Sequence, residues 1–460
     1  MSDLIAQIEK LNKQNHFSSI KYNGEYVWPY LRILLGLSFK KEVKTKLSKK
    51  ILIKGIFYGF YCWLRFSITP RKASIFMLSS GHYKVEEERV LYDKFLYHFQ
   101  NELDKSHTSY LVSDFYSDFI IPKNLSYAPN YHPTQFIIIF LSIFWRIQFE
   151  INKNFWKGPI SEFLESISDT KLDITNNIEW KVFFLLKQSN YFKKVLIKAG
   201  VRRVLVVCYY DNKSLALVKA ANELGIDIMD IQHGVQGKNH VAYTGWNAET
   251  IKNSNFFPSH FWVWSSFDKK NLNQVFSEKH IIKGGNLWLN DHIQHKEKKF
   301  ILFTAQGLGN NFPSQFLDSI KLYNGDLQWK IRLHPRQRNS IPLVRNLFRS
   351  QGILHKVEIV AATNDPLTSI LQETAIHITQ FSSVVLEAYS FNIPSIVIEP
   401  KGVDYYKDQL PKEFLKKGFN SHDILVHLNE IQKIWKYDTL KNSNIEFAGN
   451  SQILKFFKLD

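Results

Sequence analysis

Short apolar runs alternate with amphipathic segments along most of this chain. Strand-like character is seen in RRVLVVCYY, KKFILFTA and IPSIVIEP, and helical periodicity is seen in SLALVKAANELG. Alternation of this kind predicts an α/β fold with parallel sheets. The chain has 460 residues, 45% of them hydrophobic, which is more than one hydrophobic core usually supports. We therefore expect two domains.

The pattern divides into a lead-in, two α/β domains and a tail. A polar stretch, DHIQHKEKKF, separates the last strand and helix of the first α/β domain from a new strand. The first domain is expected to hold a strand at 73–79 and a strand, helix and strand at 202–233. The second is expected to hold strands at 300–304, 328–333, 357–360, 375–379 and 394–398, with helices at 312–323, 341–350, 366–372 and 383–391.

These elements predict two doubly wound, Rossmann-like α/β domains. We expect a basic, aromatic, helical lead-in at 1–72, which packs with or belongs to the N-terminal domain. An N-terminal Rossmann-like domain at 73–292 and a C-terminal Rossmann-like domain at 293–440 follow. The remaining residues, 441–460, are expected to form a tail or a helix that crosses back.

Positive charge is concentrated at the start of the chain. The formal net charge is +17 and the pI is about 9.4, which indicates an anionic partner such as a membrane, a phosphorylated substrate or nucleic acid. Residues 1–75 carry fourteen Lys and Arg against four Asp and Glu. More than half of the excess charge therefore lies in one sixth of the chain.

Two apolar stretches stand out in the first third of the sequence. The stretch at 51–68 is interrupted by Lys54 and Arg65. It is typical of a helix that lies in the headgroup layer of an anionic membrane, and equally of a core helix with a solvated basic face. The run at 136–145 is too short to span a bilayer, so we expect a buried element or part of the same membrane-facing surface.

Several classes of protein fit the sequence poorly. Cys62 and Cys208 are the only cysteines, so neither a disulfide framework nor a thiolate metal site is expected. No signal peptide opens the chain and no fixed-period repeat is found, which favours a cytoplasmic protein that is not a solenoid. The sequence contains no zinc-finger, RNP, KH or helix-turn-helix signature, so nucleic-acid binding is not favoured.

The segment AIHITQFSSVVLEAYSFNIPSIVIEP carries the strongest local signal. A strand is expected to end at Gln380, and Ser382 and Ser383 follow at the turn into a helix. Serine hydroxyls and free amides at a helix start can bind phosphate, although a serine there can also be a simple N-cap. Glu387, one turn further, and Glu399, after the next strand, are candidates for binding ribose hydroxyls, with a plain surface role open for Glu399.

The segment WKIRLHPRQRNS carries a second signal. Its strand delivers His334 and Pro335 to the carboxyl edge of the sheet, where ligands of open α/β folds bind. Arg336 and Arg338 follow. An imidazole and guanidinium groups at this edge could bind a phosphate and stabilise a departing nucleotide without a metal. A solvated turn is the alternative.

The first α/β domain offers candidates for a general base. Asp211 and His233, the latter in a Gln-His-Gly turn, are both expected at the carboxyl edge of the sheet. Either could accept the proton of an acceptor hydroxyl. Asp211 could instead cap a helix, and His233 could be a turn residue. His82 and Asp93 are weaker candidates for acceptor-side groups.

The order of these motifs resembles that of a known group of enzymes. The QHG turn, the FWVW…GGN segment, the strand ending in His-Pro and the block S-S-x-x-x-E-A…P-S-I-V-I-E-P resemble bacterial GT-B glycosyltransferases of capsule and lipopolysaccharide assembly. The His334-Pro335 and Ser382-Ser383 pairs look like the HP and S motifs of sialyl-, polysialyl- and Kdo transferases that use CMP-sugars. The motif of acidic residues followed by Gly, expected on the acceptor side, has no clear copy.

The resemblance implies the GT-B arrangement, in which two Rossmann-like domains face a cleft, with 73–292 as the acceptor domain and 293–440 as the nucleotide-sugar donor domain. It also implies a function. His334 and Ser382 or Ser383 would bind the phosphate of a nucleotide-sugar, with CMP-sugar favoured, and transfer to a glycan or lipid-linked acceptor would proceed with inversion and without a metal or other cofactor. The protein would lie on the inner face of the cytoplasmic membrane. Alternatives are a CDP-glycerol or CDP-ribitol phosphotransferase, a sugar-nucleotide 2-epimerase, and a non-catalytic membrane-associated or nucleic-acid-binding protein.

Overall fold

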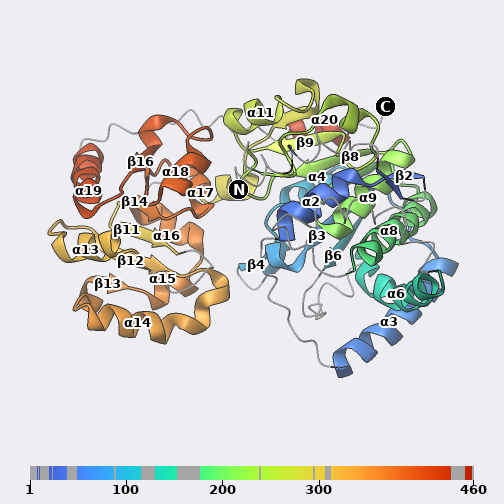
Figure 1. Ribbon diagram of the computed structural model, residues 1–460, viewed down its shortest axis with the longest axis horizontal. Coiled ribbons are helices and arrows are strands. Elements are labelled where there is room, and N and C mark those ends of the chain that lie inside the picture. The colour runs from blue at the N-terminus through green and yellow to red at the C-terminus, as the bar shows by residue number, and fades with distance from the viewer. Residues whose placement is uncertain are drawn as a thin grey trace. The chain divides into compact units, whose positions relative to one another are not determined.

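The chain folds as two compact units, Met1–Gly284 with Ala448–Asp460, and Gly285–Phe447. Figure 1 shows both, each as a sheet covered by helices. The computed structural model describes residues 8, 10, 20–22, 24–38, 49–87, 90–115, 130–152, 177–237, 240–293, 296–305, 312–436 and 451–457.

The first unit is built on a six-stranded sheet in the order β10-β9-β8-β7-β3-β6, and every pair of neighbours is parallel. Two antiparallel pairs, β1–β2 and β4–β5, stand apart from it. The strands are β1 Lys21–Tyr22, β2 Glu25–Tyr26, β3 Ile75–Ser80, β4 Lys84–Glu87, β5 Val90–Asp93, β6 Tyr110–Phe115, β7 Arg203–Val207, β8 Asp227–Ile231, β9 His260–Val263 and β10 Ile281–Lys283.

Helices flank this sheet, and α8 packs along α9. The long α8 ends at Gly200, whose left-handed backbone (φ 75°) suits a residue without a side chain. The helices are α2 Trp28–Ser38, α3 Lys49–Ile68, η2 Gly81–Tyr83, α4 Tyr97–Lys105, α6 Thr134–Ile151, α8 Ile178–Ala199, α9 Asn212–Glu223, α10 Ala248–Lys252, α11 Ser266–Leu272, η3 Glu278–His280 and α20 Ser451–Phe457.

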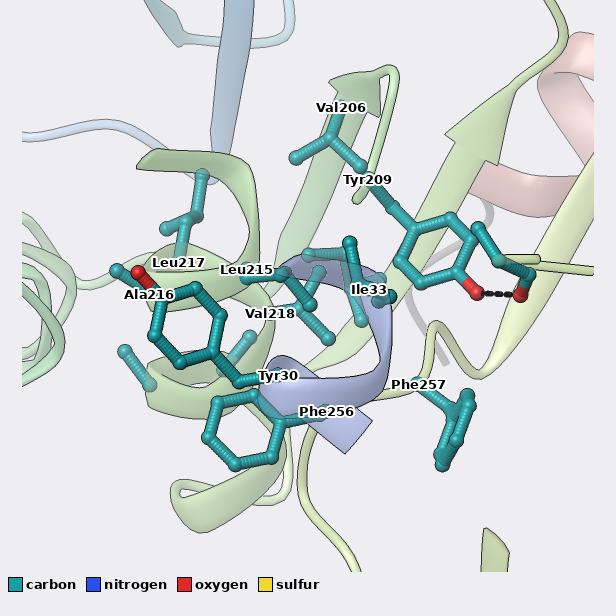
Figure 2. Packing of buried hydrophobic residues seen from close by; sticks show 14 of the residues in the cluster. Tyr30, Ile33, Val206, Tyr209, Leu215, Ala216, Leu217, Val218, Phe256 and Phe257 are labelled. Carbon is teal, nitrogen blue, oxygen red and sulfur yellow. Dashed lines mark hydrogen bonds between the residues drawn. The ribbon is translucent and has the colours of Figure 1, made fainter. Parts of the chain in front are cut away.

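Helix α2 lies inside the core of the first unit. Figure 2 shows Tyr30 and Ile33 of this helix among side chains of β7 and α9, such as Val206 and Leu215, and all four are buried. Arg32 is also buried. Its guanidinium has hydrogen-bond partners there, because it donates to the carbonyls of Gly245 (2.9 Å) and Thr244 (2.7 Å). The aromatic segment around residue 30 is therefore a core element.

Helix α3 has the opposite character. Only 17% of the stretch Ile51–Ile68 is buried, so the alternative of an ordinary core helix is wrong for this segment. The run at 136–145 is longer than expected, because it lies within the 18-residue α6, of which 33% is buried. By length and composition alone, the described residues include two helices that could cross a membrane, namely these two.

The second unit also has a six-stranded parallel sheet, in the order β13-β12-β11-β14-β15-β16. Its strands are β11 Phe300–Thr304, β12 Gln328–Arg332, β13 Val357–Glu358, β14 Thr374–Thr379, β15 Ser395–Val397 and β16 Leu415–Lys417. Its helices are α12 Leu287–Asp291, α13 Ser314–Leu322, η4 Pro335–Ser340, α14 Ile341–Ser350, η5 Leu354–Lys356, α15 Val360–Asn364, α16 Leu367–Glu373, α17 Val384–Ser390, α18 Pro400–Tyr406, η6 Lys412–Phe414 and α19 Ser421–Lys436.

The predicted fold class, α/β with two Rossmann-like domains, is confirmed by these two parallel sheets. The strands expected in the second domain are all present, and those expected at 328–333, 357–360 and 394–398 are one or two residues shorter than predicted. The apolar run expected as a strand at 357–360 pairs only at Val357 and Glu358, because α15 begins at Val360. The Glu358 carboxylate accepts from the amides of Ala361 (2.7 Å) and Ala362 (2.6 Å), which starts that helix early.

Candidate functional site

Strand order marks one point on each sheet where a ligand is expected. In chain order, the second sheet runs 3-2-1-4-5-6, and the first runs 2-1-3-4-5-6. Ligands of such doubly wound sheets bind beyond the carboxyl ends of the strands, where the order reverses. The reversal falls between β11 and β14 in the second unit and between β3 and β7 in the first.

Ser382 and Ser383 follow β14 at the reversal point of the second sheet. The amide of Ser382 donates to Oγ1 of Thr379 (3.1 Å), and that hydroxyl donates to the carbonyl of Thr304 on β11 (2.9 Å). Ser383 occupies the N-cap position of α17 without making a side-chain cap, and its side chain is exposed. The hydroxyl oxygen of Ser382 instead accepts from the amide of Val384 (3.4 Å), so the local capping role considered for these serines falls to Ser382 and not to Ser383. The α17 helix is shorter than the predicted 383–391.

Glu399 lies at the end of the next strand and is half-buried. Its Oε1 accepts a hydrogen bond from Nε2 of Gln380 (2.5 Å), the residue that follows β14. Gly402, in the first turn of α18, lets that helix approach closely, because a Cβ there would overlap the carbonyl of Gln380. This contact brings the ends of β14 and β15 together and leaves Glu399 beside the serine turn.

His334 follows β12, one strand beyond β11, and its side chain is half-buried. Its carbonyl accepts from the amide of Gln337 (2.7 Å), which closes the turn. The sheet spacing places the carboxyl ends of β12 and β14 about 10 Å apart, on either side of β11. Arg338 is exposed nearby, whereas the side chains of Pro335 and Arg336 lie outside the described residues.

Arg332 is the last residue of β12 and was not among the predicted site residues. Its Nη1 donates to the carbonyls of Ala362 and Asp365, both at 2.7 Å. Burial lowers the pKa of its guanidinium, while the carboxylate of Glu387 on α17 favours the charged form. The carboxyl edge that carries the His334 and serine turns therefore also carries an arginine and a glutamate that interact electrostatically.

Asp211 lies at the reversal point of the first sheet and acts as the N-cap of α9. Its Oδ1 accepts from the amide of Ser214 (2.8 Å), and its Oδ2 accepts from Nζ of Lys213 (2.6 Å). Both oxygens are engaged, so the capping role considered for this residue is observed.

His233 follows β8, the strand beside β7, and lies in an aromatic cluster. The hydroxyl of Tyr210 lies 3.2 Å from its Nε2, so the two can share a proton. The rings of Tyr83 and Tyr210 each lie 5.7 Å from the imidazole. Burial raises the pKa of both tyrosines, which keeps their hydroxyls protonated. His233 thus lies next to a neutral hydroxyl at the expected ligand edge.

A buried ionic cluster lies beside β3 and contains Asp93, one of the weaker acceptor-side candidates, together with Lys84 and Asp114. Nζ of Lys84 on β4 lies 3.0 Å from Oδ2 of Asp114 and 3.7 Å from Oδ2 of Asp93. Burial raises the pKa of Asp114, and the Lys84 ammonium opposes that rise. Asp93 also accepts from Ser79 Oγ (2.5 Å) and from the amides that follow β5. Asp93 therefore anchors the β4–β5 hairpin, and the side chain of His82 lies outside the described residues.

Asp230 supports the turn that carries Asp211 and Tyr210. It is fully buried in β8, where Oδ1 accepts from the amide of Tyr209 (3.0 Å) and Oδ2 from the hydroxyl of Tyr243 (2.8 Å). Burial raises its pKa to about 7 against these hydrogen bonds. Cys208, directly before the turn, has a left-handed backbone (φ 69°) that is costly for a residue with a side chain. The only sequence signal for Asp230 was a carboxylate inside an apolar strand.

Metal ligation finds no support in the part of the chain that the structure describes. No group of three or more His, Cys, Asp or Glu side chains there could hold a metal ion. The thiol of Cys208 is buried, and burial raises its pKa, so it is neither a nucleophile nor a metal ligand at neutral pH.

Comparisons with known proteins bear on the fold. Neither a family model nor a curated protein sequence matches the chain. Among solved structures, it is similar to UDP-GlcNAc 2-epimerase from Neisseria meningitidis bound to UDP-GlcNAc, with 15% identity, a TM-score of 0.50, and coverage of 83% of this chain and 98% of that one.

Two other solved structures align with lower scores. They are UDP-GlcNAc 2-epimerase from Methanocaldococcus jannaschii (TM-score 0.46, 15% identity, 84% of this chain and 98% of that one) and the lipopolysaccharide outer core galactosyltransferase WaaB (TM-score 0.45, 14% identity, 84% and 100%). Together with the two sheets, the N. meningitidis structure defines the class of this chain as a two-domain α/β protein with a GT-B fold.

Proposed function

We propose that this protein is a glycosyltransferase that moves a sugar from a nucleotide-activated donor to a surface polysaccharide or lipopolysaccharide acceptor. The observation that carries the proposal is the position of Ser382 and Ser383 beyond β14, where the strand order of the second sheet reverses. Serine hydroxyls at such a point can donate to a nucleotide phosphate. A protein of the same fold is described with UDP-GlcNAc bound, which supports a nucleotide-sugar as the donor.

Donor binding is assigned to the edge that β12, β14 and β15 share. His334, with Pro335, Arg336 and Arg338, would contact the phosphates and stabilise the charge that develops on the leaving nucleotide. Ser382 and Ser383 would bind the same phosphates from the other side of β11. Glu387 and Glu399 would accept from ribose hydroxyls. Two carboxylates near the phosphate need cations to offset them, and Arg332 supplies one beside Glu387.

The acceptor is assigned to the first unit, with His233 as the general base. Asp211 is the less suitable base, because its two oxygens already accept from Ser214 and Lys213. The hydroxyl of Tyr210, next to His233, could hold the imidazole in place or relay its proton. The sequence resemblance implies transfer from a CMP-sugar with inversion and without a metal. In place of a metal ion, the cations around His334 would stabilise the negative charge on the leaving nucleotide.

A nucleotide panel tests the donor assignment. We expect CMP to raise the thermal unfolding midpoint of the full chain more than CDP, UDP or GDP, because a ligand that binds only the folded state stabilises it. A concentration of about 100 times Kd corresponds to about 2.7 kcal/mol. Preference for UDP, together with epimerisation of added UDP-GlcNAc, would favour a sugar-nucleotide 2-epimerase, and preference for CDP would favour an alditol phosphotransferase. No shift with any nucleotide would contradict the proposal.

The substitution His334→Ala tests the phosphate contact. Loss of one charge-stabilising group should lower kcat by about 10²–10³-fold and reduce the CMP-induced thermal shift. The fold should persist, since the side chain lies at a sheet edge. His355→Ala, an exposed histidine in the same unit, is the matched control and should behave as the wild type. Wild-type turnover by the His334 variant would remove this residue from the site.

A further inference from the structure

Helix α3 is apolar over most of its circumference, with Lys54 and Arg65 exposed on one face, yet only a narrow stripe of it is covered. Within Ile51–Ile68 the buried residues are Gly55, Gly59 and Cys62, spaced four and three positions apart, which places them on one helical face. Apolar helix surface as wide as this is normally covered by protein or by lipid. The described protein covers α3 on a single side.

The covered stripe packs tightly on α6, as Figure 1 indicates at the edge of the first unit. A Cβ on Gly59 would overlap the backbone carbonyl of Phe136, so glycine is required for this close approach. Aromatic contacts extend the interface, with ring centroids 5.1 Å apart for Tyr58 and Phe136 and 5.3 Å for Phe60 and Phe140. The start of α6 is buried in the core, so it holds α3 in a defined place.

The uncovered faces form one concentrated apolar surface, which we call the α3–α6 surface. Of the nineteen exposed large hydrophobic side chains in the described residues, thirteen belong to these two helices. Phe57 and Ile68 are each 70% exposed, and Ile151 is 77% exposed. The full set is Leu52, Ile53, Phe57, Tyr58, Phe60, Tyr61, Trp63, Leu64, Ile68, Ile143, Phe144, Ile147 and Ile151. Apolar exposure on this scale marks an interaction site.

Charge around this surface selects an anionic partner. Residues 49–72 contain six Lys and Arg and no Asp or Glu. At the carboxyl end of α3, a pocket of about 90 Å³ is lined by apolar side chains such as Trp63 and Ile137, together with Arg71, Lys194 and Lys198. Cations at the mouth of an apolar pocket match the junction between lipid phosphate and acyl chain.

Helix α3 is long enough to span a bilayer, but its composition favours an orientation parallel to the membrane surface. Its 20 residues correspond to about 30 Å, and Lys54 and Arg65 are both exposed within that length. The start of α6, against which α3 packs, lies in the protein core rather than in lipid. Both observations place the helix pair at the interface of one leaflet.

We propose that the α3–α6 surface inserts into one leaflet of an anionic phospholipid membrane, with lipid phosphates at Arg71, Lys194 and Lys198. The pocket lies near the amino ends of β6 and β7, because Leu111 and Ala199 line it. His233 follows the carboxyl end of β8, at the opposite edge of the same sheet. Membrane binding and donor binding are thus separate properties, and this inference stands whether or not the proposed transfer activity does.

Vesicle flotation of the full chain tests the insertion. The wild type should float with phosphatidylcholine vesicles containing 30% phosphatidylglycerol and much less with pure phosphatidylcholine. The double variant Phe57→Ser, Ile68→Ser should bind the anionic vesicles at least about tenfold more weakly, because two exposed apolar anchors are lost. The control Leu322→Ser, Leu343→Ser removes two exposed apolar side chains of the second unit and should bind as the wild type.

A charge-reversal pair tests the lipid phosphate site. Lys194→Glu with Lys198→Glu should weaken binding to anionic vesicles at least about tenfold, since each cation near an anionic surface adds to the attraction. Lys252→Glu with Lys279→Glu gives the same change in net charge from exposed lysines elsewhere in the first unit and should have a smaller effect. Equal effects of the two pairs would overturn the phosphate site.

Two outcomes would overturn the proposal as a whole. Unchanged flotation of the Phe57, Ile68 variant would show that lipid does not cover this surface. A wild-type dimer in solution that the same variant converts to monomer, with no vesicle binding by either, would make a second copy of the chain the occupant. Unfolding midpoints with and without CMP for each variant report separately on folding and on the donor site, so a failed nucleotide assay cannot be mistaken for a failed membrane assay.

Discussion

At the scale of single residues, Asp230 sets a pH dependence of stability. Burial raises its pKa to about 7, whereas an unfolded chain has an aspartate pKa of 3.8. The folded chain therefore binds more protons than the unfolded chain between these values. The stability associated with this group is fully present below about pH 4 and is lost as the pH rises toward 7.

The substitution Asp230→Asn keeps one acceptor oxygen, for the amide of Tyr209, and turns its amide nitrogen, a donor, toward the hydroxyl of Tyr243, but it cannot ionise. We expect the variant to gain thermal stability relative to the wild type as the pH rises, with a larger difference in unfolding midpoint at pH 8 than at pH 5. Asp227→Asn is the control, because that carboxylate begins the same strand but is exposed and paired with Arg203 (3.1 Å). A pH-independent difference for Asp230→Asn would contradict the raised pKa.

At the scale of elements, Gly59 allows the close packing of α3 against α6. Gly55→Ala would place a Cβ 3.8 Å from the ring of Phe136, an ordinary contact, and should stabilise the helix by up to about 1 kcal/mol through helix propensity. Gly59→Ala would place the same group on the carbonyl of Phe136 and should destabilise the first unit by about 1–3 kcal/mol. Chemical denaturation of both variants measures the difference. Equal stability would mean that α3 is not held against α6.

At the scale of the whole molecule, the last helix belongs with the first unit although about 160 residues of the second unit precede it. Phe457 of α20 packs on Phe99 of α4, with ring centroids 6.3 Å apart, and Phe456 packs on His260 of β9 at 5.3 Å. Removing residues 451–460 should destabilise the first unit by about 3 kcal/mol, since two buried phenylalanines are lost. Removing only residues 458–460 is the control, and an equal effect would contradict these contacts.

Several features of this protein could be predicted from its sequence. Apolar strands such as KKFILFTA and IPSIVIEP alternate with amphipathic helices, and that periodicity is a local property, so the two-domain α/β class and most strands of the second unit were predicted within a few residues. Candidates that directly follow a strand, such as His334 and Ser382, were predicted at the sheet edge for the same reason. Their binding of a donor stays a prediction.

Tertiary structure alone decided the rest, because those features depend on what packs against what. Two apolar segments of similar composition differ in burial, because α2 is enclosed in the core and α3 is largely exposed. The difference comes from their contacts with elements distant in the sequence. Lys84, Asp93 and Asp114 meet only because β4, β5 and β6 are brought together. The sequence by itself determined the fold class and the residues at strand ends, whereas burial, which requires the assembled chain, decided the pKa of Asp230 and which apolar side chains of α3 stay exposed.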